Sequence, residues 1–257
     1  MGKGDEQRVF RSLRIMEVIV GASMPMSLAR LAAKTNIPKA TVARNVKALI
    51  DSDYVALIPG RRELIPGPRA VSLSIGVLGN GYFRRECRAI LRKLVQITGE
   101  TCNFTVLDGD RVKYIERVQT EMPLQVHLEA GTRAPLHCTA GGKLFLAKMD
   151  QPVRDNIITA LRLDALTEKT ITDPIELNRE LDRVQKLGYG VDNQEYIVGM
   201  IGIAVPAKTS MIEETVAALV CHATAARTSI VELEKHLPAF RTASSEISAL
   251  ILRGQDP

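Results

Sequence analysis

The fold of the N-terminal part of this chain is decided by residues 26–67, MSLARLAAKTNIPKATVARNVKALIDSDYVALIPGRRELIPG. Ser27 precedes an apolar-periodic stretch and suits the N-cap of a first helix over residues 27–34. A tight turn over residues 35–38 ends in a proline, whose fixed φ fits the first turn of a second helix over residues 39–52. The spacing therefore predicts two short helices joined by a tight turn.

The second helix is predicted to have two different faces. Its inward face carries apolar residues at helical spacing, namely Val42, Val46, Leu49 and Ile50. Its outward face carries a small residue, a hydroxyl and two cations, namely Ala40, Thr41, Arg44 and Lys47. Such a face suits the phosphate-lined major groove, where Arg44 could bind a guanine edge with two hydrogen bonds. The alternative is an ordinary surface helix whose charges are only solvated.

A basic hairpin follows the second helix. Residues 54–58 and 63–66 are β-prone and flank a Pro-Gly turn. Arg61 and Arg62 lie at its tip, where they are better placed to contact phosphates or the minor groove than to aid folding. Directly after two helices and a turn, this hairpin predicts the wing of a winged helix-turn-helix. The residues predicted to bind DNA are Ser27, Lys39, Ala40, Thr41, Arg44, Asn45, Lys47, Arg61 and Arg62.

Composition and charge agree with a DNA-binding segment followed by a second domain. A length of 257 residues favours two domains, and a hydrophobic content of 46% supports packed cores. The chain has no tryptophan, which disfavours stacking on single-stranded bases. Residues 1–80 hold 12 Lys and Arg against 6 Asp and Glu, a net charge of +6, whereas residues 81–257 hold 22 against 23, a net charge of −1. The excess positive charge therefore lies in the segment predicted to bind DNA.

No targeting signal is evident in the sequence. The first residues are polar and lack the apolar region of a signal peptide, and Glu6 stands where an acylation site needs Ser or Thr. No stretch approaches the apolar length of a membrane span. The four cysteines are scattered without a C-x-x-C motif, which is typical of a reducing cytoplasm. We expect a cytoplasmic protein that does not engage a membrane.

Helices are predicted on both sides of this basic segment. Residues 7–20 predict an amphipathic helix that completes a three-helix core, with an inward stripe of Val9, Leu13, Met16 and Val20. Residues 69–78 predict a short helical connector between glycine-containing breaks. We therefore expect a winged helix-turn-helix over residues 1–67, a helical linker over residues 68–80 and a second domain over residues 81–257.

The second domain mixes helices with hairpins. Helices are predicted over residues 84–98, 151–161, 173–187 and 238–253, and strands over residues 103–107, 111–115, 124–128, 200–205 and 216–221. Asp-Gly between the first two strands is a strong hairpin signal. Asp173 and Gly188 suit the N-cap and the end of one helix. This pattern predicts an α+β domain with a largely antiparallel sheet.

Two further motifs carry a resemblance to a known family. Residues 135–143, PLHCTAGGK, and residues 188–192, GYGVD, follow the predicted helix-turn-helix in this order. From residue 7 to residue 253 the chain resembles the IclR (isocitrate lyase regulator) family of bacterial transcriptional regulators. The resemblance implies a GAF-like effector-binding domain and a homodimer, or a dimer of dimers, on palindromic operators. It implies double-stranded DNA, a small carboxylate effector and RNA polymerase as partners, and no cofactor.

The first of these motifs suits the binding of an anion. It is not a P-loop, because two positions lack the required Gly and Ser or Thr. Its Gly-rich turn is expected to feed a helix over residues 143–148 and to present backbone N–H groups to a carboxylate, although a tight turn needed only for packing is the alternative. The resemblance places an acidic effector against the backbone of Ala140 and Gly141 and against Asp192.

The other implied pocket positions depart from the family pattern. Gly202 stands where some members have a cysteine, whereas Val220 and His222 stand where some have serines. His222 adds a donor that could carry a positive charge. We expect a larger, aromatic carboxylate rather than the smallest keto acids. The implied effector-binding positions are Val126, Ala134, Ala140, Gly141, Asp192, Met200, Gly202, Val220 and His222.

Other chemistries are less well supported by the residues. His127, His137, Cys138 and His222 lack the spacing of zinc ligands, so we favour buried or pocket histidines over a metal site. No G-x-S-x-G elbow supports acyl transfer. The main alternative is a small-molecule-binding or catalytic domain that uses the helix-turn-helix only for assembly. The charge split argues against it, and we expect a ligand-responsive regulator that is not an enzyme.

Overall fold

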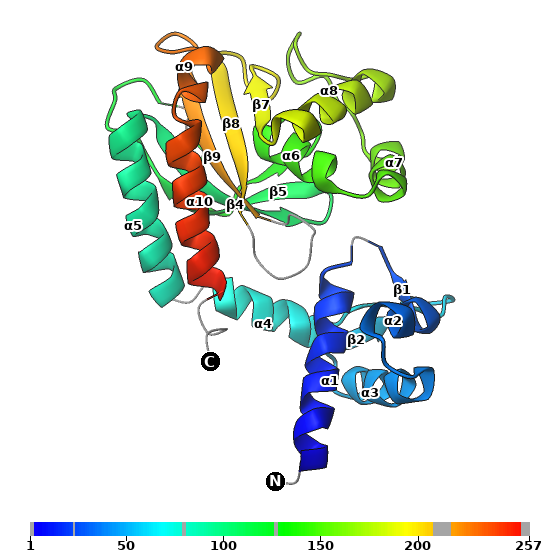
Figure 1. Ribbon diagram of the computed structural model, residues 1–257. Coiled ribbons are helices and arrows are strands. Elements are labelled where there is room, and N and C mark those ends of the chain that lie inside the picture. The colour runs from blue at the N-terminus through cyan, green and yellow to red at the C-terminus, as the bar shows by residue number, and fades with distance from the viewer. Residues whose placement is uncertain (1–2, 23, 79–80, 126–127, 208–216, 253–257) are drawn as a thin grey trace. The chain divides into compact units, whose positions relative to one another are not determined.

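The computed structural model describes residues 3–22, 24–78, 81–125, 128–207 and 217–252 (Figure 1). The chain divides into two compact units, Met1–Asn80 and Gly81–Pro257. Each unit is built around its own sheet.

The N-terminal unit is a helix-turn-helix with a wing. Its helices are α1 (Lys3–Val20), α2 (Leu28–Thr35), α3 (Lys39–Asp51) and α4 (Pro68–Leu78), and its strands are β1 (Met26–Ser27), β2 (Val55–Leu57) and β3 (Glu63–Pro66). The strands form an antiparallel sheet in the order β1-β3-β2. The two predicted helices and the hairpin are confirmed. The sequence reasoning missed β1, which is only two residues long.

Local signals set the ends of these elements. The hydroxyl oxygen of Ser27 accepts the N–H of Arg30 and caps α2, which ends at Asn36 in the left-handed region at φ 55°. Gly60 adopts φ 74° in the hairpin turn, a conformation that suits glycine. The core of the unit consists of Ile15, Ile19, Met26, Leu31, Val42, Val46, Val55 and Leu64.

The inward face predicted for α1 is wrong for three of its four residues. Ile15 and Ile19 are the α1 side chains buried in the core. Val9, Leu13 and Val20 are 58%, 54% and 50% exposed. Apolar residues recur at helical spacing on two faces of α1, and periodicity alone does not say which face meets α2 and α3. Met16 of the predicted stripe is partly buried and packs against the core, whereas the other three residues lie on a second, exposed apolar face.

The C-terminal unit is a six-stranded sheet covered by helices. Its helices are α5 (Gly81–Thr98), α6 (Ala140–Lys148), α7 (Gln151–Ala160), α8 (Pro174–Leu187), α9 (Ile230–Glu234) and α10 (Leu237–Leu252). Its strands are β4 (Thr101–Asp108), β5 (Arg111–Val118), β6 (Arg133–Pro135), β7 (Gly190–Asn193), β8 (Met200–Ala207) and β9 (Ala217–Thr224). The order is β6-β5-β4-β9-β8-β7, and every neighbouring pair is antiparallel. The predicted α+β class and antiparallel sheet are confirmed.

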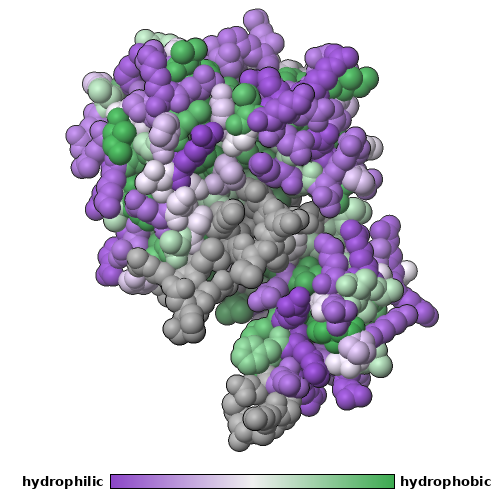
Figure 2. Space-filling model, in the orientation of Figure 1, coloured by the Kyte–Doolittle hydropathy of each residue, from purple (hydrophilic) through white to green (hydrophobic). Residues whose placement is uncertain are grey.

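Each face of this sheet has its own apolar core. One core includes Phe104, Ile203 and Leu219 and lies on the side of α5 and α10. The other includes Val112, Leu144 and Val220 and lies on the side of α6 and α8, as the ribbon shows (Figure 1). We call this second side of the sheet the α6 face. The outer surface of the unit visible in Figure 2 is mostly hydrophilic, as expected when the apolar side chains fill these two cores.

Most predicted elements of this unit are confirmed, with one clear exception. Asp173 accepts the backbone N–H groups of Ile175 and Glu176 to cap α8, and Gly188 ends this helix at φ 76°. The predicted strand over residues 124–128 is wrong for residues 124, 125 and 128, which lie outside any strand, while residues 126–127 are outside the described part of the chain. Alternating hydropathy alone does not form a strand, because a strand also needs backbone hydrogen bonds to a neighbouring strand.

Within the described ranges, no helix combines the length and the apolar character that a bilayer crossing requires.

Candidate functional sites

The outward side of α3 is the candidate DNA interface. Lys39, Ala40, Arg44 and Lys47 are exposed, and Thr41 is partly exposed. Lys47 Nζ lies 3.0 Å from Asp51 Oδ2 in an exposed ion pair, which solvent weakens and a phosphate can replace. The wing adds exposed Arg61 and Arg62. The predicted cations therefore face solvent on α3 and on the adjacent wing.

Asn45 does not belong to this interface. Its side chain is buried, with 5% of the residue exposed. Its amide nitrogen donates to the carbonyl of Thr41, and its amide oxygen accepts the hydroxyl of Ser12 on α1. Both ends of the amide are engaged inside the unit, so Asn45 joins α1 to α3 instead of reading a base. Ser27 is also engaged, because its hydroxyl oxygen caps α2.

The implied effector-binding residues of the last three strands meet on the α6 face. Asp192 on β7 is directly opposite Gly202 on β8, and Gly202 is directly opposite His222 on β9. Val220 lies one alternation further along β9 and packs in the same core as Met200. Sheet register thus brings together residues that are up to 30 positions apart in the sequence.

Asp192 is a buried carboxyl with one unsatisfied oxygen. Its Oδ1 accepts the backbone N–H groups of Glu195 at 2.8 Å and Tyr196 at 3.4 Å. Its Oδ2 is buried and has no hydrogen-bond partner among the described residues. Burial raises the pKa of Asp192 from 3.8 to about 7, and the neighbouring Glu195 adds to the shift. Asp192 can therefore exchange a proton near neutral pH and donate a hydrogen bond when protonated.

His222 occupies space that Gly202 leaves open. A Cβ atom at residue 202 would lie 3.0 Å from His222 Cδ2 and 2.8 Å from the carbonyl oxygen of Cys221. Burial lowers the pKa of His222 to about 3, with a smaller contribution from Arg117. The expectation that His222 could be cationic is therefore wrong, because an imidazole buried beside a guanidinium stays neutral.

The Gly-rich motif forms the first turn of α6. Thr139 caps the helix by accepting the N–H of Gly142 at 3.2 Å. The first backbone N–H groups, those of Ala140 and Gly141, have no acceptor within the helix. The carbonyl oxygen of Ala140 lies beside β7, because a Cβ atom at Gly190 would meet it. The first turn of α6 therefore packs beside the strand that carries Asp192.

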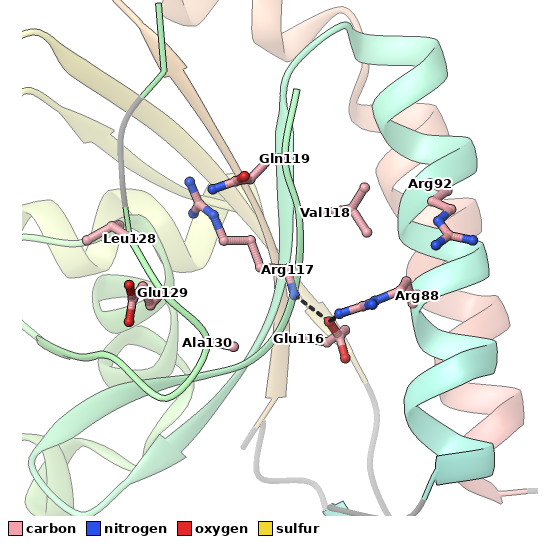
Figure 3. Close-up of a pocket in the computed structure, with 9 residues that line it drawn as sticks. All are labelled: Arg88, Arg92, Glu116, Arg117, Val118, Gln119, Leu128, Glu129 and Ala130. Atoms are coloured by element: carbon pink, nitrogen blue, oxygen red, sulfur yellow. Dashed lines mark hydrogen bonds and ion pairs between the residues drawn. The ribbon is translucent and has the colours of Figure 1, made fainter. Parts of the chain in front are cut away.

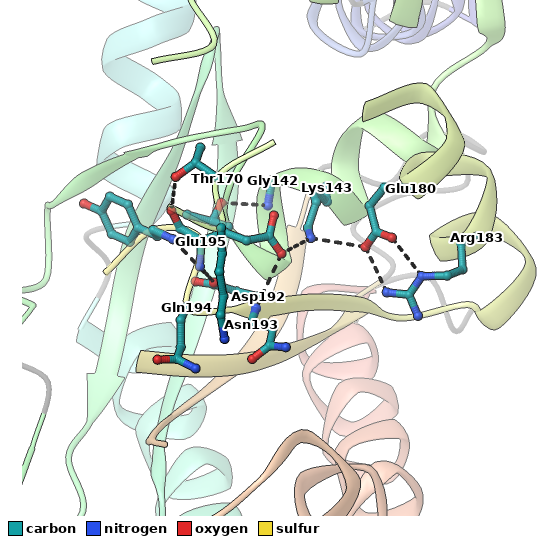
Figure 4. Close-up of polar contacts among 12 residues, drawn as sticks. Gly142, Lys143, Thr170, Glu180, Arg183, Asp192, Asn193, Gln194 and Glu195 are labelled. Carbon is teal, nitrogen blue, oxygen red and sulfur yellow. Dashed lines mark hydrogen bonds and ion pairs between the residues drawn. The ribbon is translucent and has the colours of Figure 1, made fainter. Parts of the chain in front are cut away.

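The helix begins earlier than the sequence predicted, and its first turn contains a buried lysine. It begins at Ala140, so Lys143 falls in its first turn with only 1% of the residue exposed. Lys143 Nζ lies 2.5 Å from Glu195 Oε1 and 3.2 Å from Glu180 Oε1 (Figure 4). The lysine thus ties α6 to α8 and to the loop after Asp192, and it is not available to an incoming ligand.

The remaining implied pocket residues fall in two groups. Ala134 and Met200 are fully buried in the core of the α6 face. Val126 lies outside the described residues, as does His127. His137 is buried, and its Nε2 lies 3.1 Å from the carbonyl oxygen of Asp164.

Comparison with known proteins identifies the family. Residues 9–58 match the family described as "IclR helix-turn-helix domain", and residues 76–249 match the one described as "Bacterial transcriptional regulator IclR C-terminal". The chain belongs to the IclR family of bacterial transcriptional regulators.

Individual relatives and structures agree with this assignment. "Probable transcriptional regulator SauR" of Cupriavidus necator is 38% identical over 92% of this chain and 94% of its own length. Thermotoga maritima IclR shares the fold with a TM-score of 0.63 at 24% identity, over 96% of this chain and 99% of that chain. An IclR homolog from Microbacterium hydrocarbonoxydans complexed with 4-hydroxybenzoate has a TM-score of 0.59 at 21% identity, over 95% and 99% of the chains. The family consists of transcriptional regulators rather than enzymes, which disfavours the catalytic alternative.

Three polar residues of the α6 face were missed by sequence reasoning in this IclR-family chain. Asn103, Tyr114 and Arg117 are all buried, and they lie on β4 and β5. Strand alternation was the available signal, because Asn103 shares a face with Thr105, and Tyr114 shares one with Val112. The sheet order that puts β4 beside β9 could not be read from the sequence.

Replacing Asp192 by Asn is expected to remove a pH dependence of stability. Because the folded chain holds the pKa of Asp192 near 7 instead of 3.8, stability is lost as the pH rises between these two values. The slope is roughly 1.4 kcal/mol per pH unit for one such group. Asp192→Asn stays neutral and still accepts the Glu195 N–H, so it should gain on the wild type as the pH rises. Urea denaturation at about pH 5 and about pH 8 measures the difference.

The exposed Asp155 on α7 supplies a matched control. Asp155→Asn should follow the wild-type pH profile. A profile of Asp192→Asn that runs parallel to the wild type would show that Asp192 is ionised across this range.

Proposed function

We propose that this chain binds a palindromic operator through α3 and the wing, and that a small carboxylate on the α6 face modulates this binding. The observation that carries the proposal is the exposed cationic side of α3, beside a wing with two arginines, in a segment of net charge +6. A major-groove helix with flanking phosphate contacts needs this combination. Modulation requires only that the effector binds two arrangements of the DNA-binding units with different affinity.

We propose that the chain assembles as a homodimer through the same unit. A groove of about 580 Å³ runs between α1 and α4 and is lined by apolar residues of both helices. Val9, Leu13, Val20 and Leu73 are exposed in it. A second copy of this chain would cover these side chains and give the two-fold symmetry of a palindromic operator. We also propose RNA polymerase as a partner of the promoter-bound chain.

A carboxylate effector suits the α6 face. The first amides of α6, which have no acceptor within the helix, and the protonated form of Asp192 are hydrogen-bond donors, and an acid supplies the acceptors. A fold neighbour carries 4-hydroxybenzoate, which makes aromatic acids the first ligands to test.

Removing Arg44 is expected to reduce sequence discrimination. Arg44→Ala should lose about 1–3 kcal/mol of discrimination at one base pair if its guanidinium binds a guanine edge. Competition between the operator and single-base variants, at fixed salt, measures the loss. Arg14→Ala removes the same charge from the exposed side of α1 and should leave discrimination unchanged. Equal discrimination by Arg44→Ala and the wild type would count against this contact.

Selection from fragmented genomic DNA of the source organism tests the function as a whole. Purified full-length protein is mixed with the fragments at near-physiological salt and excess competitor DNA. A few recovered fragments that share an inverted repeat would support operator recognition, and their neighbouring genes would suggest effectors. If a folded oligomer recovers nothing above background, with and without a panel of acids, the helix-turn-helix serves assembly only.

A further inference from the structure

A chain of buried polar side chains crosses the α6 face from β5 to β9 and back. Arg117 Nη1 donates to Asn103 Oδ1 at 3.0 Å. Asn103 Nδ2 lies 3.2 Å from the carbonyl oxygen of Val220 and 3.5 Å from His222 Nδ1. His222 Nε2 in turn lies 3.4 Å from the hydroxyl oxygen of Tyr114. Arg117, the most exposed of the four linked residues, is only 9% exposed.

The orientation of the Asn103 amide follows from its neighbours. A guanidinium has only donors, so the atom that faces Arg117 must be the amide oxygen. The carbonyl of Val220 only accepts, so the atom that faces it must be the amide nitrogen. The same NH2 group faces His222 Nδ1, which must therefore be an unprotonated acceptor. Two independent contacts thus fix one tautomer of His222.

Arg117 is the first residue of this series of hydrogen-bonded side chains, and its backbone N–H on β5 helps to hold it in place. Figure 3 shows Arg117 extending away from α5, while Glu116 lies toward it. Glu116 accepts the N–H of Arg117 at 3.1 Å and the guanidinium of Arg88 at 2.7 Å. Although burial opposes it, these hydrogen bonds lower the pKa of Glu116 and keep it an anion. The position of Arg117 is therefore set by two contacts, one from its guanidinium to Asn103 and one from its backbone N–H to Glu116.

The tautomer of His222 determines what Tyr114 can do. A neutral imidazole with a free Nδ1 carries its hydrogen on Nε2 and donates it to the oxygen of Tyr114. The hydroxyl hydrogen of Tyr114 is then left for another acceptor, and the described part of the chain offers it none. Burial raises the pKa of Tyr114, with Tyr196 and Asp192 adding to the shift, so the hydroxyl keeps this hydrogen. Tyr114 is thus a buried donor without an acceptor.

A second unsatisfied polar group shares this face. Asp192 Oδ2 is buried and unpartnered within the described ranges, and Asp192 is near enough to Tyr114 to affect its pKa. The strands between them contribute apolar Val220 and Met200. An unmade buried hydrogen bond costs about 1–3 kcal/mol, so a ligand that satisfies both groups gains from each.

We propose that the effector is a small acid with accepting oxygens at both ends, one bound by the Tyr114 hydroxyl and the other held at Asp192. Arg117, Asn103 and His222 are positioning residues that keep Tyr114 a donor. The inference rests on the proposed effector role of the α6 face. It adds which group binds the end of the ligand that is far from Asp192. Hydroxy acids, oxo acids and dicarboxylates belong to this class, whereas acids with a hydrocarbon tail do not.

The tautomer can be measured on the effector-free full chain. The chain has four histidines, so ring-nitrogen NMR after histidine labelling gives few signals, and His222→Gln assigns the one of interest. We expect the neutral Nε2–H form. Asn103→Asp replaces the donor by an acceptor and should convert His222 to the Nδ1–H form, which a purely structural role would not do. An Nδ1–H form in the wild type would overturn the inference, because Tyr114 would then donate to His222.

Calorimetric titration with matched acids tests the ligand class. 4-Hydroxybenzoate is compared with benzoate, and succinate with butyrate. We expect the two-ended acid of at least one pair to bind about tenfold more tightly, and Tyr114→Phe to remove that preference. Tyr189→Phe is the control, because its hydroxyl donates to Glu234 and its side chain belongs to the core on the other face.

The outcomes separate this inference from the function on which it rests. Equal binding within both pairs, or a preference that survives Tyr114→Phe, would overturn the inference and leave the carboxylate effector standing. If none of the four acids binds to a chain that still binds its operator, both the inference and the proposed carboxylate effector are overturned.

Discussion

Lys143→Met is expected to destabilise the C-terminal unit by about 3–5 kcal/mol, because it leaves the buried carboxylate of Glu195 without its cation, whereas Glu180 keeps its ion pair with Arg183. Lys143 is 1% exposed, and Glu195 and Glu180 both contact its Nζ. Burial already raises the pKa of Glu195 against the effect of Lys143, so losing the lysine makes its ionised form costlier still. The destabilisation should therefore grow as the pH rises. Urea denaturation of the full chain at two pH values measures it.

Lys148→Met is the matched control for this change. Lys148 lies in the last turn of the same helix and is partly exposed. Its loss should cost less than about 1 kcal/mol. A similarly small effect for Lys143→Met would mean that the buried ion pairs contribute no net stability, as well-packed apolar replacements sometimes show.

Gly190→Ala should add one of the most disruptive single methyl groups in the C-terminal unit. The new Cβ would meet the carbonyl oxygen of Ala140 and would lie 3.2 Å from Leu144 Cβ. Backbone cannot move aside as a flexible side chain can, so β7 must separate from α6. We expect a loss of about 3 kcal/mol or more, at the upper end of overpacking effects. The same separation moves Asp192 from the start of α6, so effector binding should be lost as well.

Urea denaturation and calorimetric titration measure the two consequences of Gly190→Ala. Gly76→Ala is the control, because a Cβ at Gly76 meets no atom within 4 Å and alanine favours the helix in which it lies. A stability and an effector affinity of Gly190→Ala equal to those of the wild type would show that β7 and α6 are not in close contact in solution.

Local signals made much of the fold predictable from the sequence. The caps at Ser27 and Asp173 act within three residues, and the glycines at 60 and 188 adopt the positive φ that their turns require. Such signals need no knowledge of distant residues. The antiparallel class of the sheet followed from the hairpin signal and from the alternation of helices and strands.

Much of what the sequence did not predict depends on contacts between distant parts of the chain. The burial of Lys143 depends on Glu195, which lies 52 residues away and holds its ammonium group. Asn45 looks like a base contact until Ser12, 33 residues away, accounts for its amide oxygen. The polar chain of the α6 face joins Asn103 to His222 across 119 positions. Periodicity along one element carries no information about such partners.

The close packing around Gly202 also restricts how this site can be engineered. With any side chain at residue 202, the imidazole of His222 would meet a Cβ 3.0 Å from its Cδ2 atom. The same Cβ would lie 2.8 Å from the carbonyl oxygen of Cys221, a contact that no choice of residue 222 removes. Libraries that aim to change effector preference should therefore keep glycine at residue 202 and vary residue 222.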